Sequence, residues 1–315
     1  MVAILDEVMK VMKKTIIGVT VGDPAGIGPM VMALAVRANL DLADFVVYGP
    51  KLSLDAFPDK CRLNLVDMDG EINVGRYSSN GGRASILALT TAANDLAKGS
   101  IQALVTGPID KQAFTDAGLN FPGQTELVAR TLGVKEFAMN LSGPKLRVSL
   151  VTTHMALRDV ADAITIKKIV SVIGLTKAFL KKALGKDDPV IGVLGLNPHA
   201  SDHGRFGIEE QMVIKPAILQ AQSRFNTKVV GPLPADTAFT RSVQGEFDGL
   251  VAMYHDQGLG PLKLLHFNDA VNITLGLPRP RTSPDHGPAF DIAGRGIADP
   301  TSAIQAVRQA LKLVG

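Results

Sequence analysis

Residues 15–38 read TIIGVTVGDPAGIGPMVMALAVRA, and this stretch decides the fold class. Its first seven residues are rich in β-branched side chains without polar alternation, which predicts a buried strand. The segment GDPAGIGP (22–29) predicts a turn, and Pro29 suits the first turn of a helix over residues 30–38. A strand that leads through a glycine-rich turn into a helix is the repeating unit of an α/β protein.

The same alternation continues to the end of the chain. Further strands are expected at residues 44–49, 101–108, 188–198, 227–234, 247–254 and 270–277, and a hairpin around the Gly-Pro pair of residues 136–153. Helices are expected at residues 85–99, 161–185, 208–225 and 301–314. This order predicts α/β layers with a largely parallel sheet and interleaved domains, since no repeat or linker is visible.

Composition excludes several classes of protein. Lys and Arg exceed Asp and Glu by only three (33 against 30), which is too small and too scattered an excess for a nucleic-acid footprint. Cys61 is the single cysteine, so an intramolecular disulfide and a cysteine-based zinc site are both excluded, as fits a reducing cytoplasm. No apolar run is long enough to span a bilayer. Residues 1–13 are interpreted as an N-terminal extension, with a short amphipathic helix as the alternative.

Three of the six histidines directly follow strand runs. His154 ends LVTTH, His199 ends LGLNPH and His255 ends VAMYH. The carboxyl ends of parallel strands gather ligands in open α/β sheets, and neutral imidazole is a good ligand for zinc and similar ions. These three positions therefore favour a metal site over three separately buried histidines. His203, His266 and His286 are interpreted as hydrogen-bonding or surface residues.

Other loop residues have weaker patterns. GDPAGIGP resembles a phosphate loop, but it matches neither established glycine-rich fingerprint, and a tight turn explains its glycines equally. Arg281 could grip a phosphate with a forked pair of hydrogen bonds, and Lys263 could add a point charge; surface charge is the alternative for both. Asn272 lies inside a strand run, where an isolated polar group needs a partner.

From about residue 14 to its end, the chain resembles the 4-hydroxythreonine-4-phosphate dehydrogenase family of vitamin B6 synthesis. The resemblance rests on the order of these segments: GDPAGIGP, PGQTE, LVTTHMALRD, NPHASDHGRFG, GPLPADT, AMYHDQG, VNITLGLPRPRTSPDHG and AGRG. It implies a fold like that of the isocitrate and isopropylmalate dehydrogenases, with two α/β/α domains and a cleft between them. The expected domains are residues 14–125 with 265–315, and residues 126–264. It also implies a homodimer whose active site lies near the interface.

The resemblance assigns roles to particular residues. His154, His199 and His255 correspond to the metal ligands, and Lys263, Asn272 and Arg281 to substrate-binding residues. The substrate-binding His-Thr pair of the family falls on Gln124 and Thr125. Glutamine cannot carry charge or shuttle a proton near neutral pH, so this departure puts the identity of the substrate in doubt.

The implied reaction is oxidation of 4-phosphooxy-L-threonine, with NAD or NADP and one divalent metal ion, to 2-amino-3-oxo-4-phosphobutanoate, which decarboxylates to 3-amino-2-oxopropyl phosphate. Zinc, cobalt and magnesium are the candidate metals, and no cofactor-binding residue is identifiable. Asp236 and Asp256 are candidate bases or orienting residues, with loop capping as the alternative. Two other functions stay open: dehydrogenation of a threonate or erythronate 4-phosphate or a cis-dihydrodiol, and a non-redox metal-dependent hydrolase or binding protein.

Overall fold

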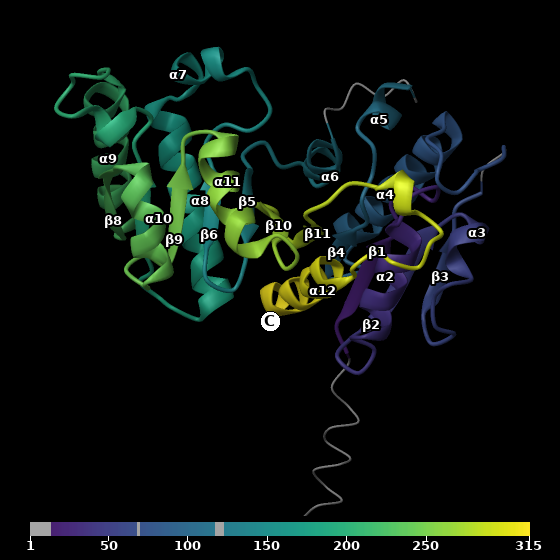
Figure 1. Ribbon diagram of the computed structural model, residues 1–315. Coiled ribbons are helices and arrows are strands. Elements are labelled where there is room, and N and C mark those ends of the chain that lie inside the picture. Colours follow the sequence, from purple (N-terminus) through teal and green to yellow (C-terminus); the bar gives the residue numbers. More distant parts are fainter. Residues whose placement is uncertain (1–13, 68–69, 117–122) are drawn as a thin grey trace, which may run out of the picture. The chain divides into compact units, whose positions relative to one another are not determined.

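The computed structural model describes residues 14–67, 70–116 and 123–315 (Figure 1). The expected N-terminal extension, residues 1–13, lies outside the described residues. The chain folds into two compact units, and each is described by itself. Unit 1 contains the described residues up to Leu132 together with His286–Gly315, and unit 2 is Gly133–Asp285. Unit 1 is thus built from two separate stretches of the chain, and unit 2 includes residues 265–285, which the sequence had grouped with the first domain.

Unit 1 is built on four parallel strands in the order β3-β2-β1-β4. The strands are β1 (Ile16–Thr20), β2 (Asp44–Gly49), β3 (Arg62–Leu65) and β4 (Ala103–Thr106). The helical segments are α2 (Gly28–Arg37), α3 (Lys51–Leu54), α4 (Ser79–Lys98), α5 (Gln112–Asp116), α6 (Gln124–Thr131), η4 (Phe290–Ile292) and α12 (Thr301–Val314). The central strands are buried on both faces, because helices cover the sheet on each side (Figure 1).

Local sequence explains how the helices of unit 1 begin and end. The strand β1, the turn and helix α2 arise where residues 15–38 predict them, with Pro29 in the first turn of α2. Helix α4 begins after Ser78, whose hydroxyl accepts a hydrogen bond from the Gly81 amide, and it ends at Gly99 with φ of 80°. A φ in this left-handed region strongly favours glycine, so Gly99 stops the helix as the sequence indicates.

Unit 2 contains a mixed sheet in the order β11-β10-β5-β6-β9-β7-β8. Its strands are β5 (Ala138–Ser142), β6 (Arg147–Leu150), β7 (Val190–Leu194), β8 (Lys228–Leu233), β9 (Gly249–Ala252), β10 (Val271–Leu275) and β11 (Arg281–Pro284). The pairs β6–β9, β9–β7 and β7–β8 are parallel, whereas β5, β6, β10 and β11 pair antiparallel among themselves. The core between these strands and their helices is aliphatic and includes Leu141, Leu150, Leu194 and Leu250.

The helical segments of unit 2 follow its parallel strands. They are η1 (Leu157–Asp159), α7 (Val160–Ala163), α8 (Ile166–Leu184), η2 (Pro198–Ser201), η3 (Glu210–Ile214), α9 (Lys215–Phe225), α10 (Ala235–Val243) and α11 (His255–His266). The helix predicted at residues 208–225 is in fact a π-helical turn followed by α9, with Pro216 in the first turn of α9. The helix is continuous across this junction, because the Lys215 amide donates to the Glu210 carbonyl in the wider hydrogen-bonding pattern of the π-helix.

The α/β class is therefore confirmed. The hairpin expected around the Gly-Pro pair is present as β5 and β6. Two strands lie where the sequence predicted none: β3, and β11, which begins at Arg281 inside the proline-rich segment LPRPRTSP. In the described part of the chain, no helix is both long enough and apolar enough to cross a membrane.

Candidate active site

Three adjacent parallel strands of unit 2 position the three predicted metal ligands. β9 lies between β6 and β7 and runs parallel to both, with Val148 opposite Leu250 and Ile191 opposite Gly249. Their carboxyl ends therefore meet at one edge of the sheet. The loops that leave this edge carry His154 after β6, His199 after β7 and His255 at the start of α11 after β9.

The rings of two of these histidines lie next to each other. The ring centroids of His154 and His255 are 5.7 Å apart, with the ring planes inclined by 43°. Nδ1 of His255 lies 2.7 Å from Oδ1 of Asp256, a side chain that is 90% exposed. A carboxylate at Nδ1 favours the tautomer that leaves Nε2 without a proton, which is the form that binds a metal. The predicted role of Asp256 as an orienting residue for His255 thus has a geometric basis.

His199 lies in a left-handed loop. Residues 199–203 all have φ between 44° and 76°, an unusual run for residues other than glycine. The His199 ring lies 6.4 Å from that of Phe206. Within the described ranges, no group of three or more His, Cys, Asp and Glu side chains is arranged to hold a metal ion. The structure therefore brings His154 and His255 together without adding His199 to a group, and the triad stays a prediction.

The predicted substrate residues Asn272 and Arg281 share one face of the sheet in unit 2. In the antiparallel pair β10–β11, Asn272 lies opposite Ser283 and Thr274 opposite Arg281. Side chains directly opposite each other point to the same face, as do those two residues apart on one strand. Arg281 is only 3% exposed, and its Nη1 donates to Oγ1 of Thr274 at 3.3 Å. A buried guanidinium excludes the alternative of plain surface charge for Arg281.

Lys263, the second cation among the predicted substrate residues, also belongs to unit 2. It lies on α11, the helix that begins with His255, and its side chain is 40% exposed. Its Nζ lies 3.3 Å from Oδ2 of Asp285, the residue that follows β11.

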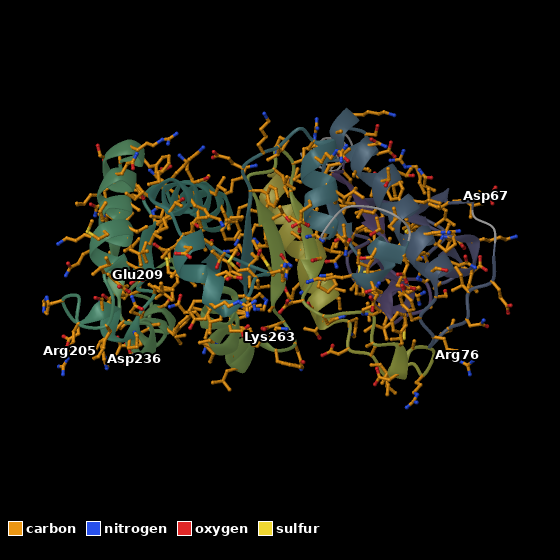
Figure 2. The ribbon with its side chains drawn as sticks, turned by 90° about the horizontal axis from the view of Figure 1, so that it is seen from above. Asp67, Arg76, Arg205, Glu209, Asp236 and Lys263 are labelled. Atoms are coloured by element: carbon orange, nitrogen blue, oxygen red, sulfur yellow. The ribbon has the colours of Figure 1, made fainter. Side chains whose placement is uncertain are left out.

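Figure 2 shows Lys263 and Asp236 on separate helices of unit 2. Asp236 is exposed in the first turn of α10, and its role as a base stays a prediction.

Gln124 and Thr125 belong to unit 1, at the start of α6. Nε2 of Gln124 donates to the Gly107 carbonyl oxygen at 3.1 Å, while its Oε1 is buried without a hydrogen-bond partner. Gln124 thus presents an acceptor where the resemblance predicts a histidine. The group that completes this contact must be a donor.

A carboxyl group that the sequence did not single out lies nearby in unit 1. Asp23 of the GDPAGIGP turn is fully buried, and its Oδ1 accepts from the Ala25 amide at 2.9 Å while Oδ2 has no partner. Burial raises the pKa of the Asp23 carboxyl, the hydrogen bond from Ala25 lowers it, and the nearby charge of Asp110 raises it further. The position of Asp23 directly after a buried strand was the available signal.

The remaining histidines behave as the sequence indicates. His266 is 5% exposed, with Nδ1 3.0 Å from Oδ1 of Asp269. His203 is exposed, and Nδ1 of His286 lies 3.0 Å from the Gly287 carbonyl oxygen. None of the three joins His154 and His255 in a metal-binding group within the described residues.

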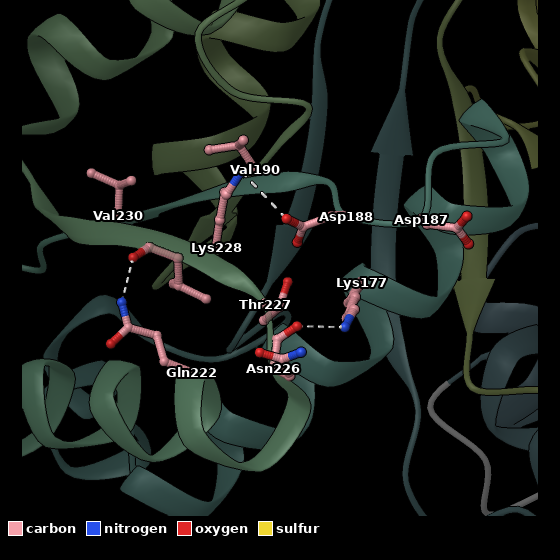
Figure 3. Close-up of a pocket in the computed structure, with 10 residues that line it drawn as sticks. Lys177, Asp187, Asp188, Val190, Gln222, Asn226, Thr227, Lys228 and Val230 are labelled. Carbon is pink, nitrogen blue, oxygen red and sulfur yellow. Dashed lines mark hydrogen bonds and ion pairs between the residues drawn. The ribbon is translucent and has the colours of Figure 1, made fainter.

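A separate pocket lies beside the edge strand β8 (Figure 3). Its two lysines are already engaged: Nζ of Lys228 lies 3.4 Å from Oδ2 of Asp188, and Nζ of Lys177 donates to the Phe225 carbonyl at 2.6 Å. None of the predicted site residues lines this pocket. The pocket is therefore separate from the candidate active site.

The sequence missed two residues that hold the histidine loops. Glu210 is 2% exposed and accepts hydrogen bonds from the Leu196 and Asn197 amides, each at 2.7 Å. Gln257 contacts the backbone of two separate segments. Both residue types are common on helix surfaces, so neither carries a signal in the sequence.

An α/β unit with histidine-bearing loops at one edge of its parallel strands has the architecture of a loop-assembled enzyme site. The family described as pyridoxal phosphate biosynthetic protein PdxA matches residues 21–310. The chain therefore belongs to this family.

Individual relatives match over nearly their whole length. A 4-hydroxythreonine-4-phosphate dehydrogenase of Sulfurihydrogenibium sp. is 42% identical, covering 94% of this chain and 98% of the relative. A D-threonate 4-phosphate dehydrogenase of Salmonella typhimurium is 37% identical, covering 96% and 100%. The crystal structure of a 4-hydroxythreonine-4-phosphate dehydrogenase from Klebsiella pneumoniae superposes with a TM-score of 0.83 at 35% identity, covering 96% and 100%.

Proposed function

We propose that this protein oxidises 4-phosphooxy-L-threonine with NAD or NADP and one divalent metal ion. The product would be 2-amino-3-oxo-4-phosphobutanoate, which loses carbon dioxide to give 3-amino-2-oxopropyl phosphate for pyridoxal 5'-phosphate synthesis. Family membership supports the reaction class. The observation that carries the proposal for this chain is the meeting of His154 and His255 at the edge of parallel strands in the unit that also holds the buried Arg281.

The donor set fits a divalent ion. His154, His199 and His255 offer imidazole nitrogens from loops at the same strand edge, and two of the rings already lie 5.7 Å apart. We propose that these three residues hold the ion, with zinc, cobalt or magnesium as candidates. When bound, the metal supplies Lewis-acid stabilisation of negative charge on oxygen, and the nicotinamide supplies the hydride acceptor.

The protein's own residues bind and orient the substrate. The Arg281 guanidinium forms forked hydrogen bonds to the phosphate, Lys263 adds a point charge and Asn272 a neutral donor. Gln124 and Thr125 are the remaining proposed substrate-binding residues, and the buried Oε1 of Gln124 would accept from a hydroxyl or ammonium group. Asp256 orients His255, and Asp236 and Asp256 are the proposed acceptors of the hydroxyl proton.

We propose that the protein is a cytoplasmic homodimer with the active site near the interface. Helix α11, which carries His255 and Lys263, also exposes large apolar side chains: Leu264 is 87% exposed, and Phe267, directly after the helix, is 76% exposed. Exposed apolar groups of this size in one place are typical of a contact surface. The same helix would then serve the site and the interface.

The test compares two histidines of one loop. His199→Ala is expected to abolish both bound metal, measured by elemental analysis, and the rise in reduced-nicotinamide absorbance on adding 4-phosphooxy-L-threonine. His203→Ala is the matched control because it is exposed and has left-handed backbone in the same loop; it should keep both. Retention of metal and turnover by His199→Ala would refute the proposed site.

A second candidate function is oxidation of D-threonate 4-phosphate or a related four-carbon phospho-acid. The similarity to a D-threonate 4-phosphate dehydrogenase supports it, and Gln124 is compatible with both substrates, because its acceptor can bind a hydroxyl group as well as an ammonium group. The kcat/KM ratio for the two substrates decides between the candidates. Erythronate 4-phosphate and a cis-dihydrodiol complete the panel, and failure to reduce the nicotinamide with every substrate would favour a non-redox hydrolase or binding protein.

A further inference from the structure

One side chain joins two of the histidine-bearing segments in unit 2. Gln257 lies in the first turn of α11, two residues after His255. Its Oε1 accepts from the Met253 amide at 2.7 Å, and its Nε2 donates to the Gly195 carbonyl at 2.7 Å. Met253 precedes His255 by two residues and Gly195 precedes His199 by four. The Gln257 side chain therefore sets the separation between the end of β7 and the start of α11.

The carbonyl group of Met253 also forms hydrogen bonds, with the segment that leads to His154. Its carbonyl oxygen accepts from both the amide and Oγ1 of Thr152, at 3.1 and 2.7 Å. Thr152 is 1% exposed and precedes His154 by two residues. Hydrogen bonds through one backbone unit thus connect all three segments that lead to the predicted ligands.

The backbone between Gly195 and His199 is tightly packed. A Cβ atom at Gly195 would lie 2.9 Å from Cα of Ala200 and 3.0 Å from Oε1 of Glu210, so only glycine fits. The next two amides, of Leu196 and Asn197, donate to the same Glu210 oxygen. A displacement of Gly195 would therefore be passed to the loop of His199, because close-packed interiors transmit strain.

We propose that Gln257 is a positioning residue for the metal site, holding the His199 loop at a fixed spacing from His255 and His154; this rests on the proposed function. Only a side chain with both a donor and an acceptor at this reach satisfies Met253 and Gly195 together. Glutamate keeps the acceptor but faces the Gly195 carbonyl with a second acceptor, and methionine keeps the shape but neither hydrogen bond. Outer residues that orient metal ligands typically change metal affinity or activity by about 10–100-fold.

The experiment measures Zn²⁺ affinity of the metal-stripped full chain by competition with a chromophoric chelator. Gln257→Met is expected to weaken Zn²⁺ binding by about 10–100-fold. Gln257→Glu should also weaken Zn²⁺ binding, and this variant tests the proposal if the methionine variant fails to fold. Gln244→Met is the matched control, since Gln244 is exposed at the end of α10 in the same unit, and its affinity should equal that of the parent.

Separate outcomes overturn the two proposals. Parental affinity in both Gln257 variants, together with loss of binding in His255→Ala, would refute the positioning role and leave the metal site standing. A parent that binds no Zn²⁺, or a His255→Ala variant that binds as tightly as the parent, would refute the metal site and the positioning role with it. Thermal unfolding of the metal-free variants supplies the structural control, because a general loss of stability would lower their midpoints without metal.

Discussion

Glu210→Gln is expected to lower the free energy of unfolding of unit 2 by about 3 kcal/mol and to loosen the loop of His199. The carboxylate is 2% exposed and accepts three hydrogen bonds. Oε1 accepts from the Leu196 and Asn197 amides at 2.7 Å each, and Oε2 accepts from Nδ2 of Asn197 at 3.0 Å. Hydrogen bonds to a charged group contribute about 1.5–3 kcal/mol each, against about 1 kcal/mol for neutral pairs.

The magnitude follows from what glutamine keeps and loses. Its carbonyl oxygen still accepts from the two amides, but each bond weakens by about 1 kcal/mol when the charge is removed. Its Nε2 then faces Nδ2 of Asn197, so two donors meet and about 1 kcal/mol more is lost. The adjacent residues 199–203 amplify the effect, because each left-handed residue other than glycine costs about 1 kcal/mol or more. Such a loop depends on contacts from outside itself.

The assay pairs Glu210→Gln with Glu209→Gln. Glu209 is the neighbouring residue and accepts one hydrogen bond, from Nδ2 of Asn197 at 2.8 Å, so its substitution should cost about 1 kcal/mol. Urea unfolding followed by circular dichroism gives the free energies, and hydrogen exchange over residues 190–205 reports the loop. Equal losses for the two variants, or unchanged exchange in Glu210→Gln, would refute the reasoning.

Three further predictions concern individual side chains. Arg281→Lys should raise KM for the phosphorylated substrate by about 10-fold or more while leaving KM for its dephosphorylated analogue unchanged, because lysine cannot form the fork; equal increases would remove the phosphate role. Asp23→Asn should make stability less dependent on pH. Burial raises the pKa of Asp23 in the folded state, so the parent loses stability as pH rises from its ordinary value of 3.8 through the raised pKa, and thermal midpoints of parent and variant should diverge over that range; parallel curves would contradict this. Gln124→His should retain turnover on the enzyme's own substrate, measured by reduced-nicotinamide absorbance, whereas a large fall would indicate a pocket specialised for glutamine.

Much of the fold follows from local sequence. The strand, turn and helix of residues 15–38, the stop of α4 at Gly99 and the hairpin of β5 and β6 each depend on residues adjacent in the chain. Local rules hid β11, since prolines flank Arg281 and only pairing with β10 makes that segment a strand. The π-helical turn before α9 likewise has no local signal beyond Pro216.

For the site, the sequence alone selected the candidate histidines, because histidines after apolar runs mark the ends of strands. Only the tertiary structure decided how they meet. The placement of β9 between β6 and β7 puts His255 between the loops of His154 and His199. This strand order depends on contacts between segments that are far apart in the chain. Met253 contacts Thr152, about 100 residues away, and Gln257 contacts Gly195, about 60 residues away. A glutamine or a glutamate acquires its positioning role only from the backbone groups that folding brings to it. That is why Gln257 and Glu210 have no signature in the sequence.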